Sequence, residues 1–368
     1  MTRDTRQHAQ RHRRLAQNLG LGLASCLGFL LLLECGVRIL DPQPAVKYRY
    51  SPTVFYEPKP NAHFNYRRRE FSVPVSYNAF GMRDCARTLN KPTDVLRVAL
   101  VGDSQTEAKE IPADSTWGSW LERDLKGRIQ DRRIEVLNFG VSGYGTVRSW
   151  ARFETLGRRF APDVVVYLFI ANDVGDVATG LDRMFYTFDG SAMRLCALPD
   201  NPRTRLTRAL VDGIKQHFQA YAFLKFRFLE LRGRLARGAP GSPAPASGAP
   251  RTGDDVVVRE PRWVLFRAAL AGLQHSVQES GAQFIVAEGS TYDESMSVAL
   301  GTICKEFGVP LVRLEPALEA LGKDLRFEFD GHWRAGGHRI ASRELAPVVE
   351  RELRAVTARC DSLVHTLK

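Results

Sequence analysis

A serine directly follows a short apolar run in the first third of the chain. The run 98–101 is typical of a buried strand, and Gly102, Asp103 and Ser104 come directly after it. In a parallel α/β sheet, ligands bind at the carboxyl ends of the strands. Ser104 therefore stands where a nucleophile would meet a substrate. The alternative interpretation is that Ser104 caps the helix that follows.

Polar residues in three later segments could complete a site for serine acyl transfer. Gly143 ends a glycine-containing segment after one strand-like run, and Asn172 follows the apolar run 164–169. Asp330 and His332 lie near the C-terminal end of the chain. A serine hydroxyl is a weak nucleophile that needs an adjacent base. We interpret His332 as that base and Asp330 as the group that orients it.

Other residues near the histidine leave alternatives open. Glu328 or Asp324 could orient His332 instead of Asp330, and His332 itself could be structural. His338 is interpreted as a structural residue of the last helix. The sequence has no paired Cys-x-x-Cys spacing, and we expect no metal site.

The four blocks, in the order Ser, Gly, Asn, His, resemble the SGNH (GDSL-like) hydrolase superfamily from about residue 77 to 356. The resemblance implies a serine esterase of membrane-anchored type that needs no cofactor. It also implies an oxyanion hole made by the backbone N–H groups of Ser104 and Gly143 and the side-chain amide of Asn172. The segment 78–84 is similar to one that precedes the serine block in anchored members.

Two departures from the family pattern are visible. The third block usually reads Gly-x-Asn-Asp, and Ile170 stands in the place of its glycine. The last block usually reads Asp-x-x-His, whereas Asp330 is two residues before His332 and Phe329 is three before it. The closer spacing resembles that of alginate-type polysaccharide O-acetyltransferases.

Apolar runs alternate with helical patterns from residue 97 onward. This alternation predicts an α/β fold, a three-layer α/β/α sandwich with a parallel, flavodoxin-like five-stranded sheet. We expect strands at 97–101, 134–138, 164–169, 284–287 and 311–314. We expect helices at 116–129, 146–159, 262–280, 293–307 and about 336–356.

Composition shifts divide the chain further. We expect a cytoplasmic basic tail at 1–14, a transmembrane signal anchor at 15–38, a stalk and small β hairpin at 39–94, and a hydrolase-like domain at 95–358. An insertion spans 177–260 and holds a basic amphipathic pattern over 206–235 and a disordered loop at about 238–255. That amphipathic segment is a docked helix, a membrane-surface helix or a lid.

The N-terminal segment predicts attachment to a bilayer. Residues 15–33 carry no charge, which is about the length that spans a bilayer core. Five arginines before them orient the N-terminus toward the cytoplasm. We therefore expect a single-pass protein of the bacterial inner membrane with a periplasmic catalytic domain. The alternative is a lipoprotein cleaved before Cys26.

Charge and cysteine content bound the partners. The net charge is +11, but no stripe of basic and aromatic residues indicates nucleic-acid binding. The sequence identifies no protein partner. Cys85, Cys196, Cys304 and Cys360 would be exported, where disulfides can persist, and three pairings are possible.

Together these features predict an exported serine hydrolase of carboxylic esters. The resemblance favours acetyl esters of a cell-envelope carbohydrate as substrates. A polysaccharide O-acetyltransferase would use the same residues, with a sugar hydroxyl in place of water. A catalytically silent glycan-binding module is the alternative outside enzymes.

Overall fold

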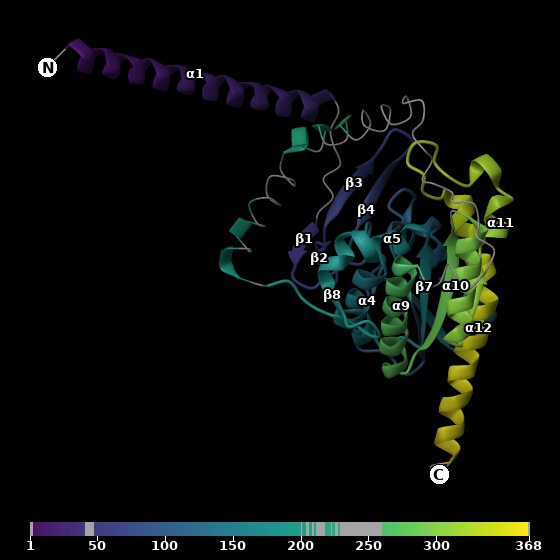
Figure 1. The fold of residues 1–368 in the computed structure, drawn as a ribbon. Helices are drawn as coiled ribbons and strands as arrows, with labels where there is room; N and C mark the ends of the chain where they lie inside the picture. The colour runs from purple at the N-terminus through teal and green to yellow at the C-terminus, as the bar shows by residue number, and fades with distance from the viewer. Residues whose placement is uncertain are drawn as a thin grey trace. The chain divides into compact units, whose positions relative to one another are not determined.

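A computed structural model describes residues 3–40, 48–199, 260–291 and 293–366, together with short stretches between 201 and 228. The chain forms two compact units, Met1–Val46 with Ala209–Ala244 and Lys47–Arg208 with Pro245–Lys368 (Figure 1). Each is described by itself.

The larger unit is built on a five-stranded parallel sheet. Its strands are β5 (Val95–Val101), β6 (Arg133–Asn138), β7 (Val164–Ile170), β10 (Gln283–Ser290) and β11 (Leu311–Arg313). They lie in the order β11-β10-β7-β5-β6, and all four neighbouring pairs are parallel. This is the flavodoxin-like order 2-1-3-4-5, with its switch point at β5. The predicted fold class is confirmed.

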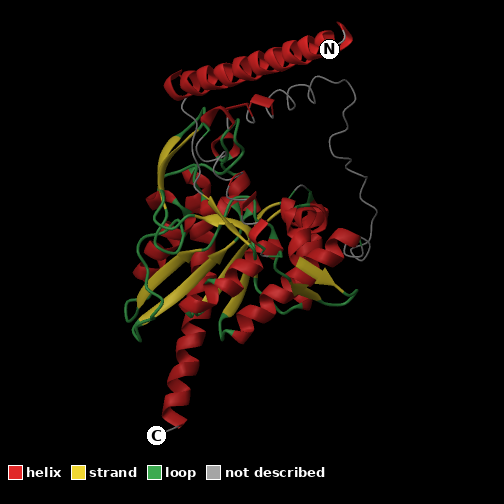
Figure 2. Cartoon of the chain, turned by 90° about the vertical axis from the view of Figure 1, so that its left-hand side faces the viewer, coloured by secondary structure: helices red, strands yellow, loops and turns green. Residues whose placement is uncertain are grey.

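Helices cover both faces of this sheet (Figure 2). One face packs on α4 (Thr146–Thr155), α5 (Asn172–Thr179), α9 (Pro261–Glu279) and α10 (Glu294–Glu306). The other packs on α3 (Trp117–Arg128), α11 (Glu315–Glu319) and α12 (Ala335–Thr366). Strand residues alternate between the two cores: Ala99 and Val101 face the first, and Val98 and Leu100 the second. Both faces of β5, β7 and β10 are therefore buried, as their uninterrupted apolar runs predict.

Three antiparallel hairpins accompany the sheet. They are β1 (Tyr48–Ser51) with β2 (Phe55–Pro58), β3 (His63–Arg67) with β4 (Ser72–Ser76), and β8 (Tyr186–Phe188) with β9 (Met193–Leu195). The second lies within 39–94, where the sequence predicts a small β hairpin. The third lies within the segment predicted as an insertion and carries no clear signal in the sequence.

Two predicted helix ends are wrong. The helix expected over 146–159 ends at Thr155, and a separate 3-10 turn covers Gly157–Phe160. The Phe153 ring occupies the space where a side chain on residue 157 would lie, 2.6 Å from that Cβ position. At the other end of the chain, α12 continues ten residues beyond the expected end at 356, to Thr366. The predicted pattern over 206–235 falls mostly, and the loop at 238–255 entirely, outside the described residues.

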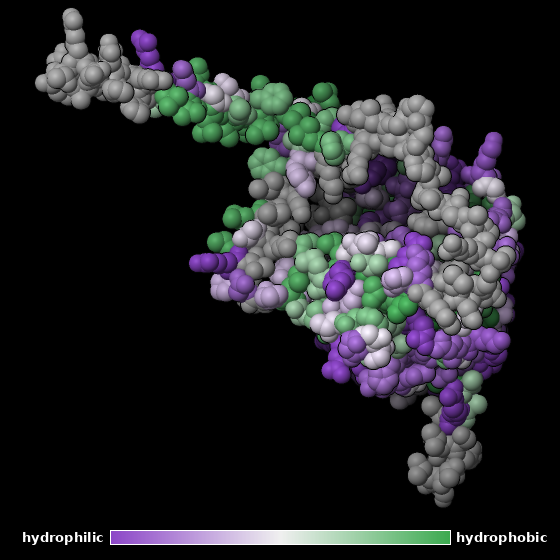
Figure 3. Space-filling view, in the orientation of Figure 1, coloured by the Kyte–Doolittle hydropathy of each residue, from purple (hydrophilic) through white to green (hydrophobic). Residues whose placement is uncertain are grey.

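The smaller unit contains α1 (Arg3–Leu40), which is long and apolar enough over Arg14–Leu40 to cross a membrane. Its leucines and Phe29 are largely exposed, and its surface is mostly apolar (Figure 3). Among the cysteines whose side chains are described, Cys26, Cys35, Cys85, Cys196 and Cys304 are free thiols, and Cys304 is buried.

Gly140 offers a test of how tightly the sheet edge is packed. A Cβ on Gly140 would lie 2.5 Å from the backbone nitrogen of Glu107 and 2.6 Å from Thr106 Cβ, so Gly140→Ala must displace the backbone. We expect a loss of about 1–3 kcal/mol in the free energy of unfolding, measured by denaturant titration. Gly127→Ala is the matched control, because it faces open space in α3 and should stabilise by up to about 1 kcal/mol. Equal stability of the two variants would contradict this packing.

Candidate active site

The nucleophile candidate lies where β5 meets the short helix α2 (Ser104–Glu107). Asp103 caps this helix, because its carboxylate accepts the backbone N–H of Gln105 at 2.9 Å. Asp103, and not Ser104, is therefore the N-cap of this helix. The Ser104 hydroxyl is half-buried and lies 3.5 Å from the Asp103 carboxylate.

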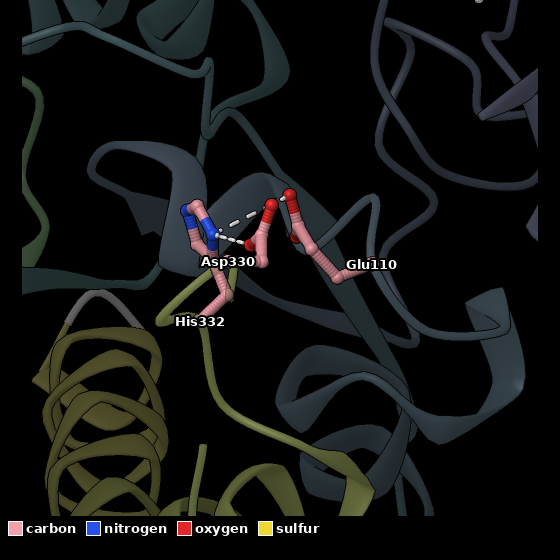
Figure 4. A group of neighbouring side chains, drawn as sticks. All are labelled: Glu110, Asp330 and His332. Carbon is pink, nitrogen blue, oxygen red and sulfur yellow. Dashed lines mark hydrogen bonds and ion pairs between the residues drawn. The ribbon is translucent and has the colours of Figure 1, made fainter. Parts of the chain in front are cut away.

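The histidine candidate lies beside two carboxylates. Nδ1 of His332 is hydrogen-bonded to the carboxylate of Asp330, and it lies 3.7 Å from Oε1 of Glu110 (Figure 4). In Figure 4 the other ring nitrogen points away from both carboxylates. A carboxylate on Nδ1 favours the tautomer that carries its proton there, which leaves Nε2 able to accept a proton. Asp330, and not Glu328 or Asp324, makes this contact.

The charges around the imidazole alter its titration. Burial lowers the pKa of His332, but the hydrogen bond with Asp330 and the charges of Glu110, Asp330 and Asp103 outweigh it, and the pKa is raised overall. Burial raises the pKa of Glu110. The positive charges of His332 and Lys109 lower it, but the pKa is raised overall. The pocket therefore stabilises an imidazolium, as a general base requires when it takes a proton.

A second contact joins the histidine loop to the serine helix. The backbone N–H of Trp333 donates to the side-chain oxygen of Gln105 at 3.2 Å. Trp333 and Gln105 are both buried, and each directly follows a candidate catalytic residue in the chain. The two segments, more than 200 residues apart in sequence, are thus held together next to Ser104 and His332.

Asn172 begins α5, directly beyond the end of β7. Its side-chain amide donates to Asp176 at 2.9 Å. An amide group has two N–H donors, so one remains for a second acceptor. The preceding Ile170 donates its backbone N–H to Asp173 at 2.9 Å.

One cavity of about 570 Å³ brings these residues together. Ser104, Asn172, Asp330 and His332 all line it. The rest of its wall comes from Asp103, Gln105, Ile170, Ala171, Gly289, Ser290, Thr291, Glu315, Leu318, Glu319, Leu325, Arg326 and Gly331. Its position beyond the carboxyl ends of β5 and β7 is the one that the fold predicts for a ligand.

Gly143 is not among the residues that line this cavity. Its φ of +76° is a conformation that favours glycine, and an added Cβ would lie 2.7 Å from the hydroxyl of Tyr56. Its carbonyl accepts a hydrogen bond from Arg148. The requirement for glycine at this position is therefore explained by the backbone and by Tyr56, and its role in an oxyanion hole stays a prediction.

His338 has a structural environment. It is buried on α12, and its Nδ1 accepts the backbone N–H of Trp117 at 3.4 Å. Burial lowers the pKa of His338 to about 3, so the ring is neutral near pH 7. The structural interpretation of this residue agrees with that geometry.

Sequence reasoning missed two acidic residues of this site. Glu110 is in a loop six residues beyond Ser104, where no motif or periodicity singles it out, and only the fold brings it to His332. The sequence places Asp103 in the turn before Ser104 but does not indicate that its carboxylate is buried near His332. Burial raises the pKa of Asp103 to about 6, although the N–H of Gln105 and the charge of His332 lower it.

Glu110, Asp330 and His332 also form the one group of potential metal ligands within the described part of the chain, with ligand atoms within 4.8 Å of one another. A cation there would compete with the imidazole for the same carboxylate oxygens. The three side chains fit an acid–base cluster as they stand.

A family model now identifies the larger unit. Residues 100–340 match the GDSL-like Lipase/Acylhydrolase family. The chain belongs to this family. The matched range contains Ser104, Asn172, Asp330 and His332, and it begins after the hairpins β1–β2 and β3–β4.

Solved structures give similar GDSL-type folds at low identity. The crystal structure of TesA has 12% identity, covers 70% of this chain and 99% of its own, and has a TM-score of 0.40. The psychrotrophic esterase EstA from Pseudoalteromonas sp. has 12% identity, coverage of 70% and 98%, and a TM-score of 0.40. An acetyl xylan esterase, AlAXEase, has 13% identity, coverage of 69% and 100%, and a TM-score of 0.38. No curated protein matches.

The carboxylate of Glu110 provides a test of the electrostatics in this GDSL-family site. Glu110→Gln removes a negative charge 3.7 Å from Nδ1 of His332, so the pKa of His332 should fall. An NMR titration of the His332 ring protons measures this shift. Glu319→Gln, which changes another acidic residue of the cavity wall, should leave the titration of His332 unchanged. Equal titration curves for wild type and Glu110→Gln would contradict the proposed coupling.

Proposed function

We propose that this GDSL-family chain is a membrane-anchored serine esterase that hydrolyses short-chain esters, above all acetyl esters of a cell-envelope carbohydrate. The observation that carries the proposal is the single cavity lined by Ser104, Asn172, Asp330 and His332. A hydroxyl, a base with an orienting carboxylate, and an amide donor are the groups that acyl transfer through a serine needs.

In the proposed reaction, Oγ of Ser104 attacks the carbonyl carbon of the ester while Nε2 of His332 takes the hydroxyl proton. The backbone N–H of Ser104 and the side-chain amide of Asn172 donate to the oxyanion, with the N–H of Gly143 as the third expected donor. The tetrahedral intermediate collapses, the ester C–O bond breaks, and the leaving alcohol takes the proton from His332. A water molecule, deprotonated by the same nitrogen, then attacks the acyl carbon. The bond from that carbon to Oγ breaks, Oγ of Ser104 takes the proton back from His332, and the acid leaves.

Asp330 and Glu110 have a common effect on these steps. Each proton that His332 accepts makes the imidazole positive, and two carboxylates near Nδ1 stabilise that charge. A carboxylate that is hydrogen-bonded to the base also fixes its orientation.

The cavity wall supports a polar, hydroxyl-bearing substrate. Ser290, Thr291, Glu315, Glu319 and Arg326 contribute hydroxyl and charged groups to it. Such groups recognise sugar hydroxyls, whereas sites for long acyl chains are predominantly apolar. We therefore infer a carbohydrate on the alcohol side and a small acyl group on the other.

Ser104→Ala tests the reaction. We expect hydrolysis of 4-nitrophenyl acetate to fall by at least about 10³-fold, and covalent labelling by a serine-reactive phosphonate to disappear. Ser115→Ala, at a half-buried serine outside the cavity, is the control and should keep both. Activity and labelling that survive Ser104→Ala would refute the role of Ser104.

An acceptor added to the same assay separates hydrolysis from transfer. With acetylated and unacetylated xylo-oligosaccharides present, an esterase releases acetate from the first and leaves the second unchanged. Acetyl transfer to the second that outpaces acetate release would identify an O-acetyltransferase. A folded protein without Ser104-dependent turnover or labelling would favour the silent glycan-binding module.

We further propose that α1 anchors the catalytic unit to the inner membrane, with that unit in the periplasm. The basic residues before the apolar segment support this orientation. In bacterial cells that express the full chain, we expect it to resist carbonate extraction and to be digested by protease added to spheroplasts. Extraction by carbonate, or protection from the protease, would contradict the anchor or its orientation.

A further inference from the structure

We propose that Glu70, at the turn of the β3–β4 hairpin, is a positioning residue that fixes the loop carrying Asp330 and His332. The hairpin precedes the range that matches the family model, so Glu70 lies outside that range, whereas the loop that it contacts lies inside it. The inference rests on the proposed function and concerns the same site.

The loop from Leu325 to Arg334 folds back on itself. The N–H of Phe327 donates to the carbonyl of His332 at 3.0 Å, and the N–H of Arg334 donates to that of Leu325 at 2.8 Å. Across the turn, the N–H of Gly331 donates to the carbonyl of Phe327 at 2.9 Å. Asp330 and His332 thus lie in a tight turn whose closure sets their relative position.

Two backbone N–H groups of this turn are satisfied from outside it. The N–H groups of Glu328 and Phe329 donate to separate oxygens of the Glu70 carboxylate, at 2.8 and 2.7 Å. The side chain of Glu70 is only 13% exposed, whereas Glu328 and Phe329 are exposed residues. A carboxylate that accepts two backbone donors makes stronger bonds than a neutral acceptor would. The second bond ends one residue before Asp330.

Side chains on both sides reinforce the contact. The rings of Phe71 and Phe327 lie 5.0 Å apart, and the guanidinium of Arg69 is 3.9 Å from the ring centroid of Phe329. Arg334 adds an ion pair with Glu70 at 3.7 Å. Three consecutive residues of the hairpin turn, Arg69 to Phe71, therefore contact the histidine loop.

The same hairpin also reaches the serine helix. Tyr77, directly after β4, donates its hydroxyl to the carboxylate of Glu107 at 2.5 Å, and Glu107 is the last residue of α2. One hairpin thus contacts both the segment that carries the nucleophile and the loop that carries the base. A displacement of about 1 Å between such groups can cost about 10²-fold in rate, so this link bears directly on turnover.

Glu70→Ala is the test, made in the full chain with 4-nitrophenyl acetate. We expect kcat to fall about 10- to 100-fold with KM unchanged, because the substrate does not contact Glu70. His332 is faced by Asp330, Glu110 and Asp103. A looser turn weakens the hydrogen bond between Nδ1 of His332 and the carboxylate of Asp330. The pKa of His332 should therefore fall, and the acidic limb of the profile of kcat against pH should move to lower pH.

Two further variants separate positioning from general damage. Glu70→Gln keeps the shape but has one acceptor oxygen and no charge, so its kcat should lie between those of Glu70→Ala and wild type. Glu57→Ala removes a glutamate of the neighbouring β1–β2 hairpin that pairs with Arg49, and it should leave kcat and the pH profile unchanged. A folded Glu70→Ala protein with wild-type kcat and pH profile would overturn the proposal.

A readout without turnover keeps this inference independent of the esterase assignment. In the full chain, Glu70→Ala should speed hydrogen exchange at the amides of Glu328 and Phe329 and should lower the NMR pKa of His332. If wild type shows no Ser104-dependent hydrolysis, the proposed function fails. These two measurements still test whether Glu70 positions the loop that carries Asp330 and His332. Unchanged exchange and an unchanged pKa would overturn it.

Discussion

The arrangement of the site depends on one buried ion pair, between Glu107 and Lys109. The two charges lie 2.7 Å apart and are almost completely inaccessible to water. A buried charge is costly unless every donor and acceptor around it is satisfied. Lys109 also donates to the hydroxyls of Tyr48 and Ser142, and Glu107 accepts from Tyr77 and from the backbone and side chain of Ser142. Burial raises the pKa of Glu107, but Lys109 and these donors lower it overall, so the carboxylate stays ionised.

This network determines where the glycine loop lies. Ser142 is held by Glu107 and Lys109, and its carbonyl accepts the hydroxyl of Tyr56 at 2.7 Å. The position of Gly143 therefore follows from residues of the first hairpin and of the segment beyond Ser104. The N-terminal hairpins are thus joined to the serine helix, the glycine loop and the histidine loop by polar contacts. The segment that the sequence predicts as a stalk and a small β hairpin therefore contacts the segments that carry the candidate site residues.

The sequence predicts what short-range patterns encode. Five apolar runs specify five buried strands, and Ser104 and Asn172 follow two of them, so the sheet topology alone brings these residues together. Glu70 and Glu110 could not be found in this way, because each lies in a loop and meets its partner only after the chain has folded. The predicted end of α12 is wrong for a related reason. Leu353 is its last fully buried apolar residue among those whose side chains are described, so the core pattern stops there, although the helix continues to Thr366.

Ile170 stands where the family pattern has glycine, and a glycine of the neighbouring strand β10 makes room for its side chain. An added Cβ on Gly289 would lie 3.0 Å from the end of the Ile170 side chain and 3.0 Å from the ring of Trp333. The glycine of β10 therefore leaves the space that the isoleucine of β7 fills, and the Ile170 backbone still donates to Asp173. Because Ile170 lines the same cavity as Ser104, it occupies volume that a smaller residue would leave to the substrate. The departure thus fills part of the cavity, while Ser104, Asn172 and His332 still line it.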